Sequence, residues 1–375
     1  DYIVRYIVEN TIGPQIDRVE REHELAAEIH ADASDRRPWQ ELYEDVKCHV
    51  GPGHVGPGRR TGPAVRSSPD TTSDTPHATP DTLDTLWQAC TTETSRREFL
   101  LNQLDGPQPG HEYDPPTRVL DLKILDPALG SGHFLVGALD YTTKRLAAML
   151  NEYADSPVFG RIREDREKIV NSLASQCIEA DEGKLTDENL LRRMVMKRCL
   201  YGVDLNPLAV ELSKLSLWLH AFTAGAPLSF LDHHVKCGNS LIGTSLEELE
   251  TRVDNAPGLF RLRMEPLERA VDHMLKVAEL SDASFEDVQR SREEYWKADA
   301  RVEAYRALLD SLTAEHFGVE DASHFIDYGM DIDLENFEES VEDSPQQDQQ
   351  RLARARETAH ERRFFHWEVE FPEVF

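Results

Sequence analysis

The stretch that decides the fold reads Asp-Pro-Ala-Leu-Gly-Ser-Gly-His-Phe and runs from Asp126 to Phe134. A short apolar run before it, at 119–125, predicts a β-strand, and the residues after the second glycine predict a helix. Gly130 and Gly132 therefore fall in a turn between a strand and a helix. Such a turn lets a ligand approach the backbone, and free amides at the helix start attract a negative group. Asp126 ends the strand, where its carboxylate can hold a cationic amino group.

A second strand end follows at 199–204, where Cys-Leu-Tyr-Gly-Val-Asp predicts a strand that ends at Asp204. Asn206 and Pro207 are typical of the N-cap and the first position of a helix. The large apolar residues of this helix fall at helical spacing; they are Leu208, Leu212, Leu215, Leu219 and Phe222. An acid at the tip of a strand beside the glycine turn can accept hydrogen bonds from both hydroxyls of a ribose.

A third strand is expected over 233–237, and it breaks at Gly238, Asn239 and Ser240. The side-chain amide of Asn239 can both donate to an adenine edge and accept from it. In an open parallel sheet such strand ends meet at the carboxyl edge, where ligands bind. Together, the three strand ends would bind an adenosine that carries an amino-acid tail. The ligand that fits this description is S-adenosylmethionine.

Five stretches of the chain, in this order, resemble the adenine-specific DNA methyltransferases of restriction-modification and phage-exclusion systems, with the gamma-type order of motifs. They are 126–136, 199–212, 214–219, 237–243 and 365–375. More narrowly, they are similar to the large methylases that are fused to restriction or defence modules. The resemblance implies a Rossmann-like α/β domain with a mostly parallel sheet and long helical insertions that binds S-adenosylmethionine. It implies cofactor-binding roles for Asp126, Ala128, Gly130, Gly132, Asp204, Leu205 and Asn239.

The resemblance also implies how this set divides its work. The first four residues would surround the methionine part of the cofactor, Asp204 would bind the ribose, and Leu205 would pack near the adenine. Asn239 stands where many related methyltransferases have an acid that contacts the adenine amino group. Leu129 stands where the family has a cysteine, and we expect this change of packing to be tolerated because the backbone does the binding.

The family's catalytic motif, Asn-Pro-Pro followed by an aromatic residue, does not occur in the sequence. In the family this motif holds a flipped adenine and follows a stretch like Phe-Pro-Glu-Val-Phe at 371–375. No catalytic residue is therefore assigned, and we expect a truncated chain that is inactive alone. Double-stranded DNA would be bound by missing C-terminal parts, and a partner chain or a nuclease module would be further partners.

The first half of the chain is expected to contain three parts. Residues 1–50 would be an N-terminal helical segment that flanks the cofactor site. Residues 51–82 are dense in Gly, Pro, Ser, Thr and Asp, which predicts a disordered linker or insertion. Residues 83–258 would form the S-adenosylmethionine-binding core, with a helical insertion at about 151–198.

The second half is expected to contain two further parts. Residues 259–350 would form a helical and acidic insertion, solvated or loosely ordered at 307–350, where Lys and Arg are absent. Residues 351–375 would return to the core as a helix and a strand. Alternating apolar and polar residues at 365–371 predict that strand.

The composition is strongly acidic, with 41 basic and 70 acidic side chains among 375 residues and a net charge of -29. Taken alone, this charge argues against DNA binding, because an acidic chain repels the phosphate backbone. Only 10 of the basic residues are Lys, a balance that we expect of a halophile's salt-rich cytoplasm, where charges are screened.

Other features of the composition also favour a cytoplasmic protein. The five scattered cysteines form no CxxC pair, and no run approaches the roughly 18 apolar residues of a membrane span. The chain begins with Asp1 and has no signal segment, so we expect an N-terminal truncation and no secretion.

Two other classes of protein stay open. A nicotinamide-dependent oxidoreductase also needs a glycine turn and a ribose-binding acid, but about 20 residues apart, whereas Asp204 lies 72 residues after Gly132. A non-catalytic remnant or interaction protein would use the helical insertions. A metal site at His233, His234 and Cys237 is not expected, because no fourth ligand lies nearby in the sequence.

Overall fold

The computed structural model describes residues 2–31, 36–50, 87–88, 90–104, 114–178, 185–255, 265–327, 334 and 336–375. The chain forms two compact units: one comprises Asp1–Ile12 with Leu120–Phe375, and the other comprises Gly13–Val119. The linker or insertion predicted at 51–82 lies outside the described residues.

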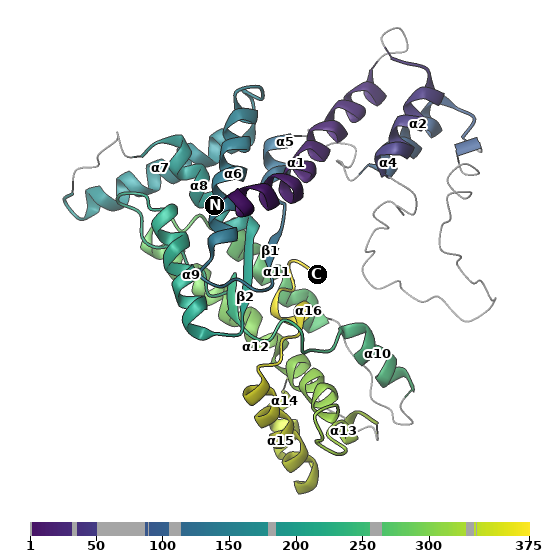
Figure 1. Cartoon of the computed structure of the whole chain (residues 1–375), viewed down its shortest axis with the longest axis vertical. Helices are drawn as coiled ribbons and strands as arrows, with labels where there is room; N and C mark the ends of the chain where they lie inside the picture. The colour runs from purple at the N-terminus through teal and green to yellow at the C-terminus, as the bar shows by residue number, and fades with distance from the viewer. Residues whose placement is uncertain are drawn as a thin grey trace. The chain divides into compact units, whose positions relative to one another are not determined.

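The unit Gly13–Val119 is helical over most of its described residues. Its elements are most of α1 (Tyr2–His30), α2 (Trp39–Val50), α4 (Glu93–Gln103) and most of α5 (Pro115–Leu120) (Figure 1). Ile29, Leu42 and Leu100 are fully buried in its core, and Tyr43 stacks on Trp87 with the ring centroids 4.6 Å apart.

Three parallel strands form the sheet of the other unit, in the order β1-β2-β3 (Figure 1). They are β1 (Ile124–Asp126), β2 (Leu200–Asp204) and β3 (Val235–Cys237). In the register Asp126 lies beside Gly202, and Asp204 lies beside Cys237, so the carboxyl ends of all three strands lie at one edge. The predicted α/β class, with a parallel sheet and long helical insertions, is confirmed.

The first strand is shorter than the run at 119–125 predicts, because the start of that run belongs to α5. The carboxylate of Asp114 accepts hydrogen bonds from the backbone N–H and the hydroxyl of Thr117 at 2.9 and 2.6 Å, as a helix N-cap does. Pro115 supplies a fixed φ at the first helical position. Because these residues start a helix, the beginning of the apolar run is helical, and only Ile124–Asp126 pair with β2.

Four helices connect or follow the strands of this sheet; they are α6 (His133–Leu150), α7 (Pro157–Ser175), α8 (Asp187–Cys199) and α9 (Pro207–His220). The predicted start of α9 is confirmed, since the side chain of Asn206 accepts from the N–H of Leu208 at 3.0 Å. The leucines at helical spacing are exposed, Leu219 to 67%, and α9 instead buries Val210 and Ser213.

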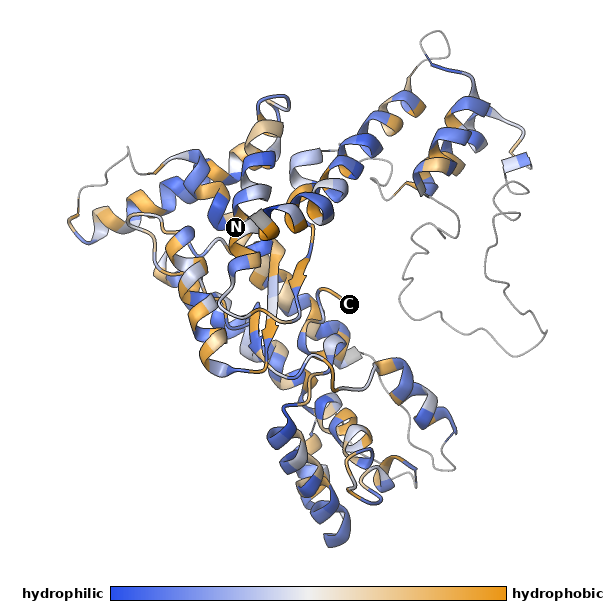
Figure 2. Ribbon diagram, in the orientation of Figure 1, coloured by the Kyte–Doolittle hydropathy of each residue, from blue (hydrophilic) through white to orange (hydrophobic). Residues whose placement is uncertain are grey.

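The chain between β3 and the C-terminal segment forms a helical insertion. Its helices are α10 (Leu246–Asn255), α11 (Glu265–Glu279), α12 (Phe285–Glu315), α13 (His324–Asp327), α14 (Phe337–Glu342) and α15 (Gln346–Arg362). Figure 2 shows that α15 is almost entirely hydrophilic. The expectation that 307–350 is solvated is wrong for 307–314, all of which are buried. Lys and Arg are absent there because this part of α12 lies in a core with Leu308 and Leu309.

The strand predicted at 365–371 is wrong, since Trp367–Glu370 form a single helical turn, α16. The N–H groups of Glu370 and Phe371 donate to carbonyls four residues back at 2.9 Å. The alternating pattern predicts a strand wrongly because its polar residues also face the interior of the protein. His366 is buried, and the Glu370 carboxylate forms ion pairs with Lys236 and Arg306. With both sides covered, a period of two no longer identifies a strand.

Two consecutive histidines before β3, His233 and His234, are buried. Burial lowers the pKa of His233 well below its ordinary value and that of His234 to about 3. His234 Nδ1 donates to the carbonyl of Leu200 at 2.5 Å. His233 stacks on Phe230 with the ring centroids 5.2 Å apart, and neither of its ring nitrogens has a partner among the described residues.

We predict that the free energy of unfolding falls as the pH drops below about 6.5, because unfolded imidazoles then take up protons that the buried ones exclude. The variant His233→Phe keeps the stack on Phe230 and removes one such group. Between pH 7.5 and 5.5, urea unfolding should show a pH-dependent loss about 1 kcal/mol smaller in this variant. The exposed His220→Phe is the control. Equal pH dependence in His233→Phe and the unmodified protein would contradict the prediction.

Candidate functional site

The carboxylate of Asp204, at the end of β2, joins two loops. Its Oδ2 accepts the backbone N–H of Gly130 at 2.7 Å, and its Oδ1 accepts the backbone N–H of Asn206 at 2.7 Å. The N–H of Leu129 donates to the carbonyl of Val203 at 3.0 Å, which adds a second tie between the loops. The structure thus brings together two residues that the sequence predicts for one site, although they lie 74 positions apart.

The glycine turn after β1 has a backbone that favours glycine. Gly130 and Gly132 have φ angles of +55° and +81°, and Gly132 is the N-cap of α6. A Cβ on Gly132 would lie 2.9 Å from the Cβ of Ser213 in α9, so the turn and α9 are in direct contact. A Cβ on Gly130 would meet no described atom within 4 Å, so this part of the turn faces open space.

Asp126 lies at the start of this turn, and its Oδ1 accepts the backbone N–H of Ala128 at 3.0 Å. Burial raises the pKa of Asp126; the hydrogen bond from Ala128 opposes this rise, and the negative charge of Asp204 adds to it. A desolvated carboxylate beside a second acid favours a cationic group as its neighbour.

Leu129 fills the space over the second strand, and its side chain is buried. A Cβ on Gly202 would lie 2.9 Å from Leu129 Cδ1, so the leucine packs directly against the β2 backbone. This contact holds the turn against the strand through packing, in addition to the hydrogen bond from the N–H of Leu129 to the carbonyl of Val203.

The third strand end carries Asn239. Its Oδ1 accepts the N–H of Leu241 at 3.2 Å, and its own N–H donates to the carbonyl of Arg363 at 2.6 Å. Leu205 and Leu241 present exposed side chains at this edge, with exposed fractions of 52% and 91%. Exposed apolar side chains beside polar strand ends give a surface on which a flat base can pack.

Arg363 is a site residue that the sequence did not reveal. Its guanidinium donates to the carbonyl of Leu205 and lies 3.1 Å from Cys237 Sγ, so it connects the loop after β2 to the end of β3. Its own backbone is left-handed, with φ +57°, just after α15. The only signal in the sequence was its nearness to the Phe-His-Trp stretch at 365–367.

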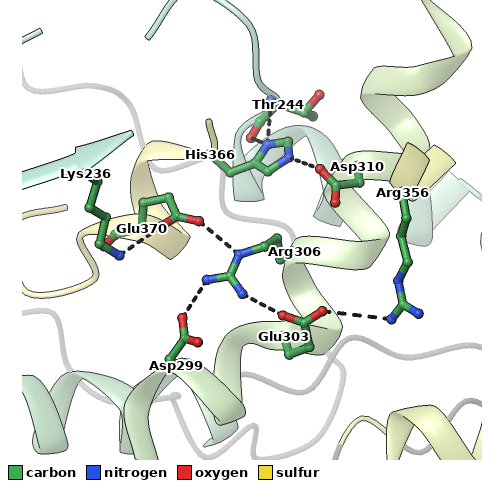
Figure 3. Close-up of polar contacts among 9 residues, drawn as sticks. All are labelled: Lys236, Thr244, Asp299, Glu303, Arg306, Asp310, Arg356, His366 and Glu370. Atoms are coloured by element: carbon green, nitrogen blue, oxygen red, sulfur yellow. Dashed lines mark hydrogen bonds and ion pairs between the residues drawn. The ribbon is translucent and has the colours of Figure 1, made fainter. Parts of the chain in front are cut away.

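A network of partly buried charges joins β3, α16 and α12 (Figure 3). Glu370 accepts from Lys236 at 2.8 Å and from Arg306 at 2.9 Å, and Arg306 also donates to Asp299 and Glu303. Burial opposes the charge of the Glu370 carboxylate, but its two cationic partners outweigh this effect and lower its pKa to about 2. All the charges in this network are paired, so it fixes α16 on the sheet and offers no free group for chemistry.

The residues at this edge fit an adenosine with an amino-acid tail. Each oxygen of Asp204 accepts one backbone amide and keeps a further lone pair for a hydroxyl. A cavity of about 470 Å³ borders the site, with Pro127, Ser240, Leu241 and Trp367 in its wall. Small-molecule sites usually have volumes of about 300–1,000 Å³.

Among the described residues no group of three or more His, Cys, Asp or Glu side chains could hold a metal ion. Within the same residues no helix is long and apolar enough to span a membrane.

Residues 198–375 match the Eco57I restriction-modification methylase family. A protein of Methanocaldococcus jannaschii, named as a type II restriction enzyme and methyltransferase, is 33% identical over 141 residues, which cover 34% of this chain and 9% of that protein. No solved structure matches. The resemblance to restriction-modification methyltransferases is confirmed.

The family match covers only part of the site. Asp204, Leu205 and Asn239 lie within it, whereas Asp126 and the two glycines precede it. The main reason to assign the glycine turn to the same site is therefore the hydrogen bond from the N–H of Gly130 to the carboxylate of Asp204.

The two glycines of the turn should respond differently to alanine. We predict that Gly130→Ala costs about 1 kcal/mol of unfolding free energy, from backbone strain alone. Gly132→Ala should cost more, because its Cβ also overlaps Ser213, and adding Ser213→Gly should recover part of that loss. Urea unfolding measures all three. Gly160→Ala, in the interior of α7, is the control and should stabilise. Equal costs at Gly130 and Gly132 would show that the contact with Ser213 has no effect.

Proposed function

We propose that this chain is the S-adenosylmethionine-binding part of a site-specific DNA adenine-N6 methyltransferase of a restriction-modification or phage-defence system. The observation that carries the proposal is the convergence of Gly130 and Asp204, in a chain whose residues 198–375 match restriction-modification methylases. The methylase match supports methyl transfer, and the convergence supports a ligand that has both a ribose and a charged tail.

Each residue of the site has a role in this proposal. Asp126 holds the cationic amino group of the methionine part, with the backbone of the glycine turn around it. The free lone pairs of Asp204 accept the ribose hydroxyls, and Leu205 packs on the adenine. Asn239 reads the adenine amino group through its side-chain oxygen. When bound, the cofactor supplies the methyl group, and these residues orient it and exclude water.

The DNA partner is also part of the proposal. In the family reaction an adenine is flipped out of the duplex and accepts the methyl group on its exocyclic nitrogen. With a net charge of -29, this chain repels phosphate, so we place the DNA-binding groups on other parts of the enzyme. Association with a nuclease module is consistent with the name of the Methanocaldococcus jannaschii relative.

Calorimetric titration tests the proposal. The unmodified chain should bind S-adenosylmethionine and not NAD. Asp204→Asn and Asp126→Asn should each weaken binding about 10- to 100-fold, because each removes a charge-assisted hydrogen bond. Asp254→Asn, an exposed acid on α10, is the matched control. Binding should also weaken with falling pH, since a protonated Asp126 loses its charge and its pKa is raised.

Three results would contradict the proposal or part of it. Binding of NAD in place of S-adenosylmethionine would point to an oxidoreductase. Failure to bind either ligand would favour a non-catalytic remnant. Equal affinity in Asp204→Asn and the unmodified chain would show that the convergence of the two loops does not form the site.

A further inference from the structure

The loop at 238–245, between β3 and α10, packs against the C-terminal segment at 363–368. Hydrogen bonds between them include Asn239 N–H to Arg363 O at 2.6 Å, Phe365 N–H to Ile242 O at 2.8 Å, and Trp367 Nε1 to Ser240 O at 3.2 Å. The loop carries Asn239, the residue that reads adenine in the proposed function.

Two glycines make the fit between these segments close. A Cβ on Gly238 would lie 2.3 Å from the ring of Phe365, and a Cβ on Gly243 would lie 2.1 Å from its carbonyl oxygen. No side chain has room at either position, so the conformation of the loop depends on the segment that touches it.

His366 lies at the centre of this contact and is 2% exposed. Its Nε2 faces a carboxylate oxygen of Asp310 at 3.0 Å, and its Nδ1 faces the backbone N–H of Thr244 at 3.0 Å (Figure 3). An ionised carboxylate only accepts hydrogen bonds, so Nε2 must carry the proton. In the neutral ring Nδ1 is then an acceptor, and it holds the N–H of Thr244.

Asp310 belongs to α12, the long helix of the insertion, and a second contact follows the same route. The hydroxyls of Thr244 and Thr313, one turn further along α12, are 2.8 Å apart. Asp310 and Thr313 are both buried. The insertion therefore touches the loop only a few residues from Asn239, through side chains of buried residues.

We propose that His366 is a positioning residue for cofactor recognition. Through its hydrogen bonds with Asp310 and Thr244, it ties the loop at 238–245 to α12. This tie holds the side chain of Asn239 in position at the adenine edge. The inference rests on the proposed function, because it assumes that adenine binds at Asn239. Supporting hydrogen bonds of this kind matter because recognition groups must be held to within about 0.5 Å.

The test is the ratio of dissociation constants for S-adenosylhomocysteine and its deaminated analogue, S-inosylhomocysteine, which has an oxygen in place of the adenine amino group. The unmodified chain should prefer the adenine compound. Asn239→Ala removes the amide that contacts the adenine amino group, and His366→Ala removes the imidazole that positions it. Both variants should therefore lower the preference about 10-fold. Asp310→Asn should also lower it, because an amide can donate to Nε2 and allow the tautomer that no longer accepts from Thr244.

A merely structural role would not produce this pattern. His366→Asn should restore most of the preference, because its amide oxygen can accept from the N–H of Thr244. Asp282→Asn is the matched control: Asp282 is fully buried and paired with Lys197, away from the loop, so its loss should lower stability and leave the ratio unchanged. Should His366→Ala not fold, His366→Asn and Asp310→Asn still decide the question.

The two proposals fail in different ways. If the unmodified chain binds neither compound, the proposed function falls and this inference falls with it. If the unmodified chain prefers adenine and Asn239→Ala loses the preference, but His366→Ala and Asp310→Asn keep it, the proposed function stands and the positioning role is overturned.

Discussion

The carboxylate of Asp204 is the constraint on which the carboxyl edge of the sheet depends. One oxygen accepts a hydrogen bond from the turn after β1, and the other accepts one from Asn206, just before α9. Since Gly130 and Gly132 have left-handed backbones, the turn has few local preferences of its own, and an external acceptor is needed to fix it. One side chain thus fixes the loops after two separate strands relative to each other.

The contacts around this acid also explain why α9 is oriented as it is. Gly132 approaches Ser213 so closely that only small residues fit, and Ser213 is fully buried on the inner side of the helix. That side faces the turn, and the row of large leucines lies on the opposite, exposed side. A helix that is apolar on both sides gives no single face to a sequence pattern.

Much of the ligand edge was predictable from the sequence, because strong local signals produce it. The glycine turn, the acid at the end of β2 and the cap of α9 each follow from residues within a few positions. The strand expected at 365–371 failed for the opposite reason. Its polar residues have partners far along the chain, such as Lys236 and Asp310, and no local pattern records such pairs. Arg363 and His366 were missed on the same grounds.

Long-range ion pairs of this kind also change how the acidic composition should be read. Only 10 residues are Lys, and the side chains of three of them are largely buried and lie in ion pairs: Lys197 with Asp282, Lys214 with Asp232, and Lys236 with Glu370. Burial lowers the pKa of Lys197 to about 8 even though Asp282 opposes the shift. Lys197 and Lys236 neutralise acids that the fold largely encloses, whereas Lys214 pairs with the exposed Asp232. Each of these pairs is neutral as a whole, so the net charge of -29 comes from other residues.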